Sequence, residues 1–563
     1  MVEEQNKSKR SSDILRFLAW VAGIILLNLV AANYFFRLDL TEDKRYTIAP
    51  VTKQMLQELP DEVVVDVYLE GEFPAGFRRL QQSVKETLDE FRIYSGGNIR
   101  YNFIDPNEIS DEKQRTEFIT NLAKKGIIPT NLRATEDGKQ VERLVFPGAI
   151  VKYKGKETAV NLLKGNLAAS PDERLNQSVE GVEYEFATAI RKMAFQGNKI
   201  IGYIAGQGEL EMQEVTDLLG SLQEYYRVAR GELSQIPSLE GLDLIIIAKP
   251  TSAFTEADKY KIDQFIMKGG KAVFFVDALN ANMDSVGAGG MFAIPYNLNL
   301  DDLLFRYGVR LNPTMIMDLN SGFIPVVTGY MGDKPQTEMI NWRFYPLLNN
   351  FAKHPITRNL DAVYTKFIGT IDTVKADGIR KTPLVFSSKY SRVLQPPVPL
   401  TLEEARMEVK PEQFQAGELP VGYLLEGKFT SLFRNRRAPE GVQDTQVKEQ
   451  GEETKIAVFS DGDLVRNEVN PRTGQAYELG FDRFNNITFA NKELAMNTVH
   501  YLLDAEGLIN VRNKEIQLRP LDKLRVREEK TYWQLLNLGA PILLLVLFGV
   551  ARYYMRKRRY ERF

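Results

Sequence analysis

Cysteine is absent from the 563-residue chain, and histidine occurs only at His354 and His500. Without cysteine the chain has no disulfides, thiol nucleophiles, thiolate metal sites or redox-active cysteine pairs. Two histidines are too few for a histidine-rich zinc site, and neither has an evident carboxylate partner of the kind that base catalysis uses. His354 precedes a proline and His500 lies in an apolar helical pattern, so we expect both to be structural.

The chain also lacks a surplus of charge of either sign. The chain has 72 Lys and Arg against 74 Asp and Glu, which gives a formal net charge of −2. No global basic field would attract nucleic acid, so we expect no nucleic-acid partner. Because single hydrophobic cores stop growing well below this chain length, we expect more than one domain.

Charged residues are absent from one stretch near each end of the chain. Residues 17–36 and residues 531–551 are both uncharged, and each is long enough for a helix that spans a bilayer. The second stretch contains Pro541, which membrane helices tolerate. For the first stretch a cleaved signal peptide is the alternative, since basic residues precede it and small residues at 30–32 offer a cleavage site. We expect two transmembrane helices that flank the rest of the chain.

The tail at 552–563 is strongly basic, with six basic residues and one acidic residue. The positive-inside rule places such a tail in the cytoplasm. Two spans put both termini on the same side of the membrane. We therefore expect a protein of a bacterial inner membrane with both termini cytoplasmic and a large periplasmic region between the spans.

Residues 45–170 show strand and helix patterns in the order βαβαββ. An apolar strand pattern at 62–71 is followed by an amphipathic helix pattern at 78–94, and the last two strands are joined by the turn KGK. This order resembles a thioredoxin-like fold, here without a CxxC pair. We expect this domain to bind or scaffold and not to exchange disulfides.

Residues 177–510 show buried strands that alternate with helices. The runs NKIIGYIAG, LDLIIIAKP and KAVFFVD are continuous apolar strands of the kind that parallel sheets bury. Helices between such strands predict right-handed crossovers and a doubly wound α/β domain, here with insertions. The segment 433–454 combines low hydrophobicity with Pro and Gly. It predicts a flexible surface loop, with a dedicated docking segment as the alternative.

The stretch IIGYIAGQGELE at 200–211 combines an apolar strand, a glycine turn and the start of a helix, as dinucleotide-binding folds do. Gly206 and Gly208 fit the first two glycines of GxGxxG, but Glu211 stands at the third position. Glu209 and Glu211 fall in the first helical turn, where their charges would repel a phosphate. No P-loop motif occurs in the chain. We expect no nucleotide cofactor and no ATPase activity.

Polar residues follow three of the predicted strands at their carboxyl ends, where open α/β sheets bind ligands. Strand-end aspartates also cap helices and turns, so a purely structural role is the alternative. We expect no catalytic, cofactor-binding or metal-binding residues. The candidate ligand crevice consists of Gly206, Gln207, Gly208, Glu209, Asp277, Asp461 and Asp463.

Several stretches resemble a known family. They include RLDLTEDKRYTIAPVTKQML, GYIAGQGELE, LDDLLFRYGVRLN, GYLLEGKFTSLFRNR and FSDGDLVRN. These stretches are similar to the gliding-motility-associated ABC transporter component GldG and to the wider group of ABC-transporter auxiliary, substrate-binding proteins. The resemblance covers nearly the whole region between the two uncharged stretches, in order.

This resemblance implies a membrane-anchored periplasmic accessory or substrate-binding subunit that works beside a separate ABC permease and a separate cytoplasmic ATPase. It also implies a role in gliding motility or linked secretion in a bacterium of the Bacteroidetes type, and an unknown periplasmic ligand or protein partner. It transfers no catalytic residues. Two alternatives stay open: a periplasmic hydrolase or transferase, and a structural bridge to the cell envelope. The enzyme alternative lacks a GxSxG nucleophile motif.

Overall fold

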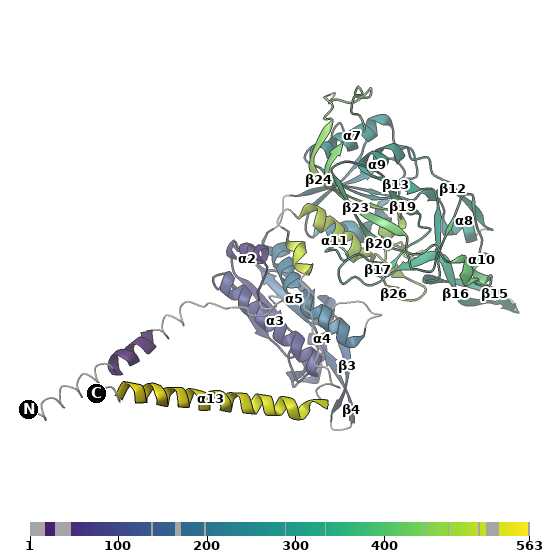
Figure 1. Ribbon diagram of the computed structural model, residues 1–563. Coiled ribbons are helices and arrows are strands. Elements are labelled where there is room, and N and C mark those ends of the chain that lie inside the picture. The colour runs from purple at the N-terminus through teal and green to yellow at the C-terminus, as the bar shows by residue number, and fades with distance from the viewer. Residues whose placement is uncertain are drawn as a thin grey trace, which may run out of the picture. The chain divides into compact units, whose positions relative to one another are not determined.

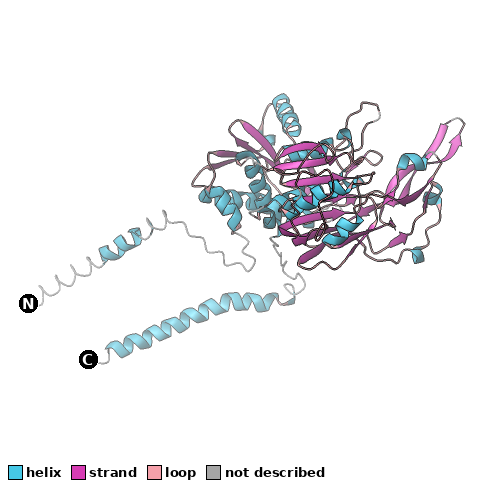
Figure 2. Ribbon diagram, turned by 90° about the horizontal axis from the view of Figure 1, so that it is seen from above, coloured by secondary structure: helices cyan, strands magenta, loops and turns pink. Residues whose placement is uncertain are grey.

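The computed structural model has two units. The first, Met1–Lys514, is mixed α/β, and the second, Glu515–Phe563, contains a long helix. Figure 1 shows the elements of both units, and Figure 2 shows how strands and helices mix in the first. The structure describes residues 17–26, 28, 47–136, 139–163, 170–195, 199–287, 289–332, 334–444, 446–470, 472–504, 507–513 and 528–560.

The N-terminal domain of the first unit contains a four-stranded sheet of order β2-β1-β5-β6. β1 and β2 are parallel, whereas β5 is antiparallel to both of its neighbours, β1 and β6. Helix α3 buries one face because its apolar residues recur every three or four positions, at Leu80, Val84, Leu88 and Phe91. The elements are α2 (Pro50–Gln57), β1 (Val63–Val67), α3 (Ala75–Tyr94), β2 (Ile99–Phe103), η1 (Pro106–Glu108), α4 (Glu112–Lys124), β3 (Thr130–Glu136), β4 (Lys139–Val145), β5 (Gly148–Tyr153), β6 (Lys156–Asn161) and α5 (Pro171–Ala194).

The second domain is built on an eight-stranded sheet of order β17-β20-β23-β24-β10-β9-β7-β8. The strands from β8 to β24 are parallel to their neighbours in this order, and the remaining pairs are antiparallel. Every residue of β9 is buried, as expected for a continuous apolar strand in a parallel sheet. The sheet is formed by β7 (Ile200–Ala205), β8 (Arg227–Glu232), β9 (Leu244–Ala248), β10 (Lys271–Phe275), β17 (Asn350–Phe351), β20 (Ile379–Phe386), β23 (Pro420–Thr430) and β24 (Gln450–Phe459).

Only the parallel half of this sheet has the α/β crossovers that the sequence predicts. β20, β23 and β24 pair antiparallel without crossover helices between them, so the whole sheet is mixed. The helical elements of the domain are η2 (Met212–Glu214), α6 (Thr216–Gln223), α7 (Glu256–Met267), α8 (Met283–Gly287), α9 (Asp301–Tyr307), α10 (Glu403–Arg406), η3 (Pro411–Gln413), η4 (Asp463–Val465), α11 (Asn491–Leu503) and η5 (Leu508–Asn513).

Short sheets between β10 and β23 form an insertion with its own apolar core, which includes Trp342 and Phe344. Figure 1 labels β12, β15, β16, α8 and α10 in this part. The inserted strands are β11 (Leu279–Asn280), β12 (Met291–Pro295), β13 (Val309–Asn312), β14 (Met315–Asp318), β15 (Ser321–Met331), β16 (Lys334–Leu348), β18 (Val363–Tyr364), β19 (Thr370–Thr373), β21 (Ser391–Leu394) and β22 (Val398–Leu400); β25 (Phe481–Asp482) and β26 (Ile487–Thr488) follow β24.

The segment 433–454 contains both packed and extended residues. The side chain of Phe433 is buried, and β24 begins at Gln450, so the end of the segment belongs to the large sheet. The backbone N–H of Lys448 donates to Oε1 of Gln264, 2.7 Å away. The predicted flexible surface loop therefore does not include the residues from Gln450 on, which pair in the large sheet, and flexibility of the residues before them stays a prediction.

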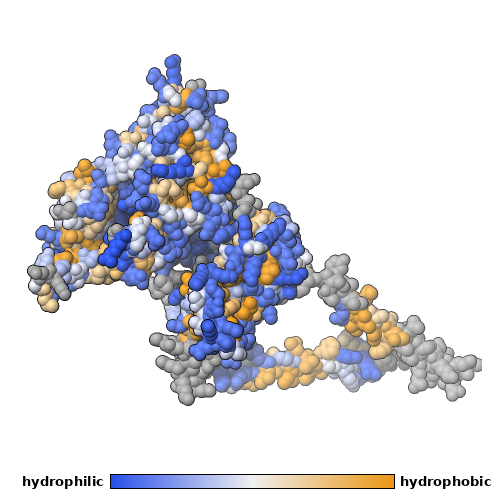
Figure 3. Space-filling view, turned by 180° about the vertical axis from the view of Figure 1, so that it is seen from behind, coloured by the Kyte–Doolittle hydropathy of each residue, from blue (hydrophilic) through white to orange (hydrophobic). Residues whose placement is uncertain are grey.

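Among its described residues, the second unit contains one helix that is long and apolar enough to cross a membrane. α13 (Lys530–Tyr560) includes Pro541, and the most apolar 18 consecutive residues within Lys530–Arg558 have a mean hydropathy of 2.0. In Figure 3 hydrophobic residues cover the middle part of this helix, and hydrophilic residues lie at both of its ends. Near the other end of the chain, Phe17–Leu26 is an apolar helix of 10 residues, shorter than a span needs. Most of the remainder of the expected first span, up to residue 36, lies outside the described residues.

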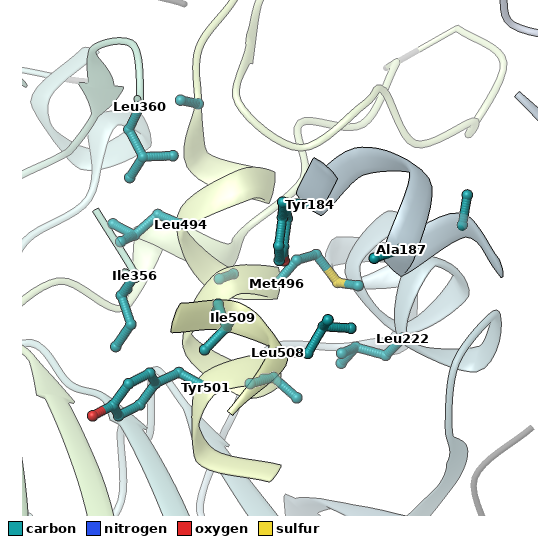
Figure 4. Close-up of a cluster of buried hydrophobic side chains, with 14 of the residues drawn as sticks. Tyr184, Ala187, Leu222, Ile356, Leu360, Leu494, Met496, Tyr501, Leu508 and Ile509 are labelled. Atoms are coloured by element: carbon teal, nitrogen blue, oxygen red, sulfur yellow. The ribbon is translucent and has the colours of Figure 1, made fainter. Parts of the chain in front are cut away.

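Helix α5 of the N-terminal domain packs against the end of the second domain. Tyr184 and Ala187 from α5 approach Met496 of α11 and Leu508 of η5 (Figure 4), within one continuous apolar core. At the edge of this contact, Nη1 of Arg191 lies 3.1 Å from Oδ1 of Asp504. The two domains of the first unit therefore share a core and a peripheral ion pair. We call this contact region the joint.

Candidate functional site

The predicted crevice residues lie at one edge of the large sheet, because β7, β9, β10 and β24 are adjacent and parallel. Residues 206–209 follow β7, Asp277 follows β10, and Asp461 and Asp463 follow β24. The strand order reverses between β7 and β9, since β8 lies on the other side of β7. Such a reversal marks the usual ligand crevice of an open α/β sheet.

Lys249 joins two of the three predicted aspartates. Its Nζ lies 2.7 Å from Oδ2 of Asp277 and 2.5 Å from Oδ2 of Asp463. All three side chains are at least 90% buried. Lys249 adopts a left-handed backbone conformation, with φ of 55°, directly after β9. A buried charge of this kind needs partners of opposite sign, and here the predicted acids supply them.

Glycine at position 462 is required by the close approach of Lys249. A Cβ at Gly462 would lie 2.5 Å from the Cβ of Lys249. The backbone N–H of Gly462 donates to Oδ1 of Asp277 at 2.5 Å. The loops after β9, β10 and β24 are thus connected by one cation, two carboxylates and one backbone amide.

The three aspartates differ in the direction of their pKa shifts. Burial, together with the nearby carboxylates, raises the pKa of Asp461 well above its ordinary value. Burial also raises the pKa of Asp277. At Asp463 burial acts in the same upward direction, but the charges of Lys249 and other nearby cations overcome it, and the pKa is lowered. The arrangement favours the ionised form of Asp463, which lies beside Lys249, more than that of Asp461.

Asp461 has a capping role. Its Oδ1 accepts a hydrogen bond from the backbone N–H of Asp463 at 2.7 Å, and its Oδ2 accepts from the backbone N–H of Lys366 at 3.1 Å. Carboxylates bound in this way hold turns together, as the structural alternative for strand-end aspartates expects. Within the described residues no group of three or more acidic or histidine side chains could hold a metal ion.

The glycine turn after β7 is closed by its own glutamate. The backbone N–H of Gln207 donates to Oε2 of Glu209 at 2.7 Å. A phosphate that approached this N–H would meet the Glu209 carboxylate. Gly206 and Gly208 have φ of 110° and 76°, a left-handed backbone that favours glycine. A Cβ at Gly208 would lie 2.1 Å from Oγ1 of Thr251, so the loops after β7 and β9 are tightly packed.

Two oxygens in this turn have no hydrogen-bond partner among the described residues. They are Oε1 of Gln207 and Oε1 of Glu209, both in side chains that are more than 90% buried. Burial raises the pKa of Glu209. Nε2 of Gln207 lies 3.4 Å from Oδ2 of Asp258, a long contact. No hydrogen bond or ion pair between described residues joins this turn directly to the lysine–aspartate group, so the predicted crevice separates into two clusters.

A cavity of about 460 Å³ adjoins the carboxyl end of β10, where Asp277 contributes to its wall. Tyr296, Phe305 and Arg310 line it from the inserted segment. The sequence patterns indicated Asp277 but not these three residues, because they come from elements with no strand-end pattern. Lys249 was also missed, although a lysine directly after five buried apolar residues is the signal that could have indicated it.

Residues 198–498 match the family described as an ABC-type uncharacterized transport system. The match covers more than half of the chain and contains all seven predicted crevice residues, so the chain belongs to this family. Residues 42–152 match a domain of unknown function (DUF7088). The family match confirms the broader part of the resemblance, to ABC-transporter auxiliary proteins.

The chain is also similar to an uncharacterized protein of Borreliella burgdorferi, with 22% identity over 575 aligned residues. That alignment covers 98% of this chain and 99% of the relative. Among solved structures, one titled mmIFT52 N-terminal domain is 13% identical, with a TM-score of 0.31, and the alignment covers 57% of this chain and 100% of that one. A TM-score this low carries no argument about the site in this chain.

Proposed function

We propose that this protein is a membrane-anchored accessory subunit of an ABC-type transport system and is not itself catalytic. The observation that carries the proposal is the family match over residues 198–498. That region includes both crevice clusters and the parallel half of the large sheet. Lys249 and its two aspartates support the fold in one cluster, and the bond from the Gln207 N–H to Glu209 does so in the other, which suits a scaffolding or ligand-holding role.

In this proposal a separate subunit hydrolyses the ATP that drives transport. The β7 turn uses its backbone N–H for the Glu209 carboxylate, where a nucleotide-binding fold would receive phosphate. We therefore propose a separate ABC permease and a separate cytoplasmic ATPase as partners. A role in gliding motility or linked secretion rests on the sequence resemblance alone and stays a prediction.

The membrane topology is part of the proposal. α13 supplies the anchor, and the basic residues at its end support a cytoplasmic C-terminus. The apolar stretch 17–36 supports a second span and a periplasmic location for the domains between. For the N-terminal domain, the strand order β2-β1-β5-β6 with an antiparallel β5 supports the thioredoxin-like assignment.

Purification of the intact chain in a mild detergent, with mass spectrometry of the copurifying proteins, tests this proposal. We expect a permease and an ATPase in a constant ratio to the chain. A matched variant that ends at residue 527 lacks α13 and should lose both partners. If the intact chain copurifies with neither, the accessory-subunit proposal is wrong, and an envelope bridge or an independent enzyme becomes the better explanation.

A further inference from the structure

The cavity of about 460 Å³ beside the end of β10 combines an apolar lining with a few charged groups. Its walls come from the loop after β10, the end of β12 with the segment that follows it, helix α9, and β13. Most of the lining residues are apolar or aromatic, and the charged ones are Asp277, Asp301, Asp302 and Arg310. Small-molecule sites commonly have this composition. The pairing of these four charges decides which kind of ligand fits. We call this cavity the β10 cavity.

The one cation in the described lining of the β10 cavity already has a counter-charge. Nη2 of Arg310 lies 2.8 Å from Oδ2 of Asp372, and both side chains are more than half exposed. Lys259 is buried, and its Nζ lies 2.9 Å from Oδ2 of Asp302 and 2.7 Å from Oε1 of Glu256. One ammonium group thus serves two carboxylates there. The lining therefore has no positive charge left for an anionic ligand.

Asp301 is the charged residue of this lining that lacks a counter-charge. Its carboxylate forms no ion pair and no hydrogen bond with any described residue. Asp277, by contrast, is bonded to Lys249. Burial, together with the charge of Asp302, raises the pKa of Asp301. A cation in the cavity would supply the missing counter-charge, so the electrostatics of the lining favours a positively charged ligand.

Two aromatic rings line the same cavity. Phe305 follows Asp301 by four residues on α9, so its ring and the carboxylate lie on the same face of the helix. The side chain of Phe305 is 51% exposed. Tyr296 lies in the segment after β12, and its hydroxyl donates to Oδ1 of Asn280 at 3.1 Å, which fixes the ring. No cation of a described residue lies over either ring. Ammonium groups bind over the faces of such rings, and here they would meet no competitor from the described chain.

From these observations we propose that the β10 cavity binds a small organic ammonium ion. The ammonium group lies at the carboxylate of Asp301 and the ring of Phe305, which are neighbours on α9. The apolar part of the ligand lies against Tyr296 and the apolar residues of the lining. The proposal deepens the ligand-holding role proposed above and rests on it, because it names the chemical class of the ligand.

A ligand in the β10 cavity would contact both the large sheet and the insertion. Val276 and Asp277 belong to the loop directly after β10, whereas α9 and β13 belong to the insertion. Asp277 is also a member of the lysine–aspartate group, so the cavity lies at the predicted ligand edge of the sheet. Binding of an amine needs no permease or ATPase. Failure of this proposal and failure of the copurification experiment are therefore separate results.

The test uses isothermal titration calorimetry of the full chain in nanodiscs of zwitterionic lipid, with empty nanodiscs as the baseline. The probe is phenethylamine, which is a cation at pH 7. It is compared with 2-phenylethanol, which is neutral, and with phenylacetate, which is an anion of similar size. We expect one phenethylammonium per chain and at least fivefold weaker binding of the other two probes. Absence of saturable phenethylammonium binding, or equal binding of the three probes, would overturn the proposal.

Two pairs of variants locate the binding. Asp301→Asn should weaken phenethylammonium binding about fivefold and leave 2-phenylethanol unchanged, because an exposed ion pair contributes up to about 1 kcal/mol. Its matched control is Asp284→Asn, an acid in the first turn of α8 outside the cavity lining, which should change neither probe. Phe305→Leu should weaken the cation about threefold, whereas Phe292→Leu, at an exposed ring outside the lining, should not. Equal effects within either pair, or an equal effect of Asp301→Asn on both probes, would contradict the proposed position of the ammonium group.

Discussion

Nζ of Lys249 and Oδ2 of Asp277 lie 2.7 Å apart in the interior, between the ends of two adjacent parallel strands. The same ammonium group is 2.5 Å from Asp463 at the end of a third strand. Two of the predicted acids, Asp277 and Asp463, are therefore the counter-charges of one buried lysine. Their first role is to connect three loops, and removal of Lys249 leaves both carboxylates without their cation.

Lys249→Met should destabilise the second domain by about 3–5 kcal/mol, because two buried carboxylates lose their cation. Thermal unfolding of the purified chain measures the effect as a lower midpoint. The matched control is Lys375→Met, since the side chain of Lys375 is 90% exposed and its removal should change the midpoint little. Equal midpoints for both variants would show that the buried network contributes nothing to stability.

Gly208→Ala should destabilise the chain by about 1–3 kcal/mol, because the left-handed backbone and the contact with Thr251 both oppose a side chain. The control is Gly220→Ala in α6, where a Cβ would have no atom within 4 Å and helix propensity improves. We expect opposite shifts of the thermal midpoint. A neutral Gly208→Ala would mean that the β7 turn can open away from the loop after β9.

Stability should fall as the pH drops from 6.5 toward 4. Burial lowers the pKa of both His354 and His500 to about 4, whereas the unfolded chain binds these protons near 6.5. Between the two values the unfolded state holds more protons, so stability rises with pH and levels off above 6.5. His500→Gln, measured by unfolding at pH 5 and pH 7, should reduce the difference between the two pH values. An unchanged pH dependence in a double variant of both histidines would assign it to other groups.

The absence of cysteine makes the topology directly testable. Asp377→Cys places a thiol at a side chain that is 91% exposed in the second domain, and Arg558→Cys places one at the end of α13. In cells with a permeabilised outer membrane, an impermeant maleimide should label position 377 at once. It should label position 558 only after the inner membrane is opened. The reverse pattern would place the large domains in the cytoplasm.

The strand patterns of the sequence predicted β7, β9 and β10 well, because continuous apolar runs of this length are typical of buried parallel strands. They also placed the acids correctly at the carboxyl ends. They could not predict the partner of those acids, since Lys249 meets Asp463 across 214 positions of the chain. Pairing at such separation depends on the strand order, which local patterns do not contain.

The antiparallel half of the sheet was harder to predict for a similar reason. β20 and β23 are strands of ordinary composition. Nothing in their own sequences indicates that they join the same sheet as the parallel strands β7, β9 and β10. The span over 17–36 stays a prediction from composition, because the structure describes the helix Phe17–Leu26 and most of the remaining residues of the stretch lie outside the described residues. The joint itself had no sequence signal, since it forms between elements that lie far apart in the chain, such as α5 and α11.

The contact between Gly462 and Lys249 also restricts how this family can diverge. Position 462 has no room for a larger residue while Lys249 keeps its left-handed backbone, and Lys249 is needed only while Asp277 and Asp463 remain charged. Among single substitutions, a larger residue at position 462 leaves a clash, loss of Lys249 leaves two carboxylates without a cation, and loss of either aspartate removes one of the two partners of Lys249. In distant relatives we expect the four positions to be retained together or replaced together, so that the loops at this edge of the sheet evolve as one unit.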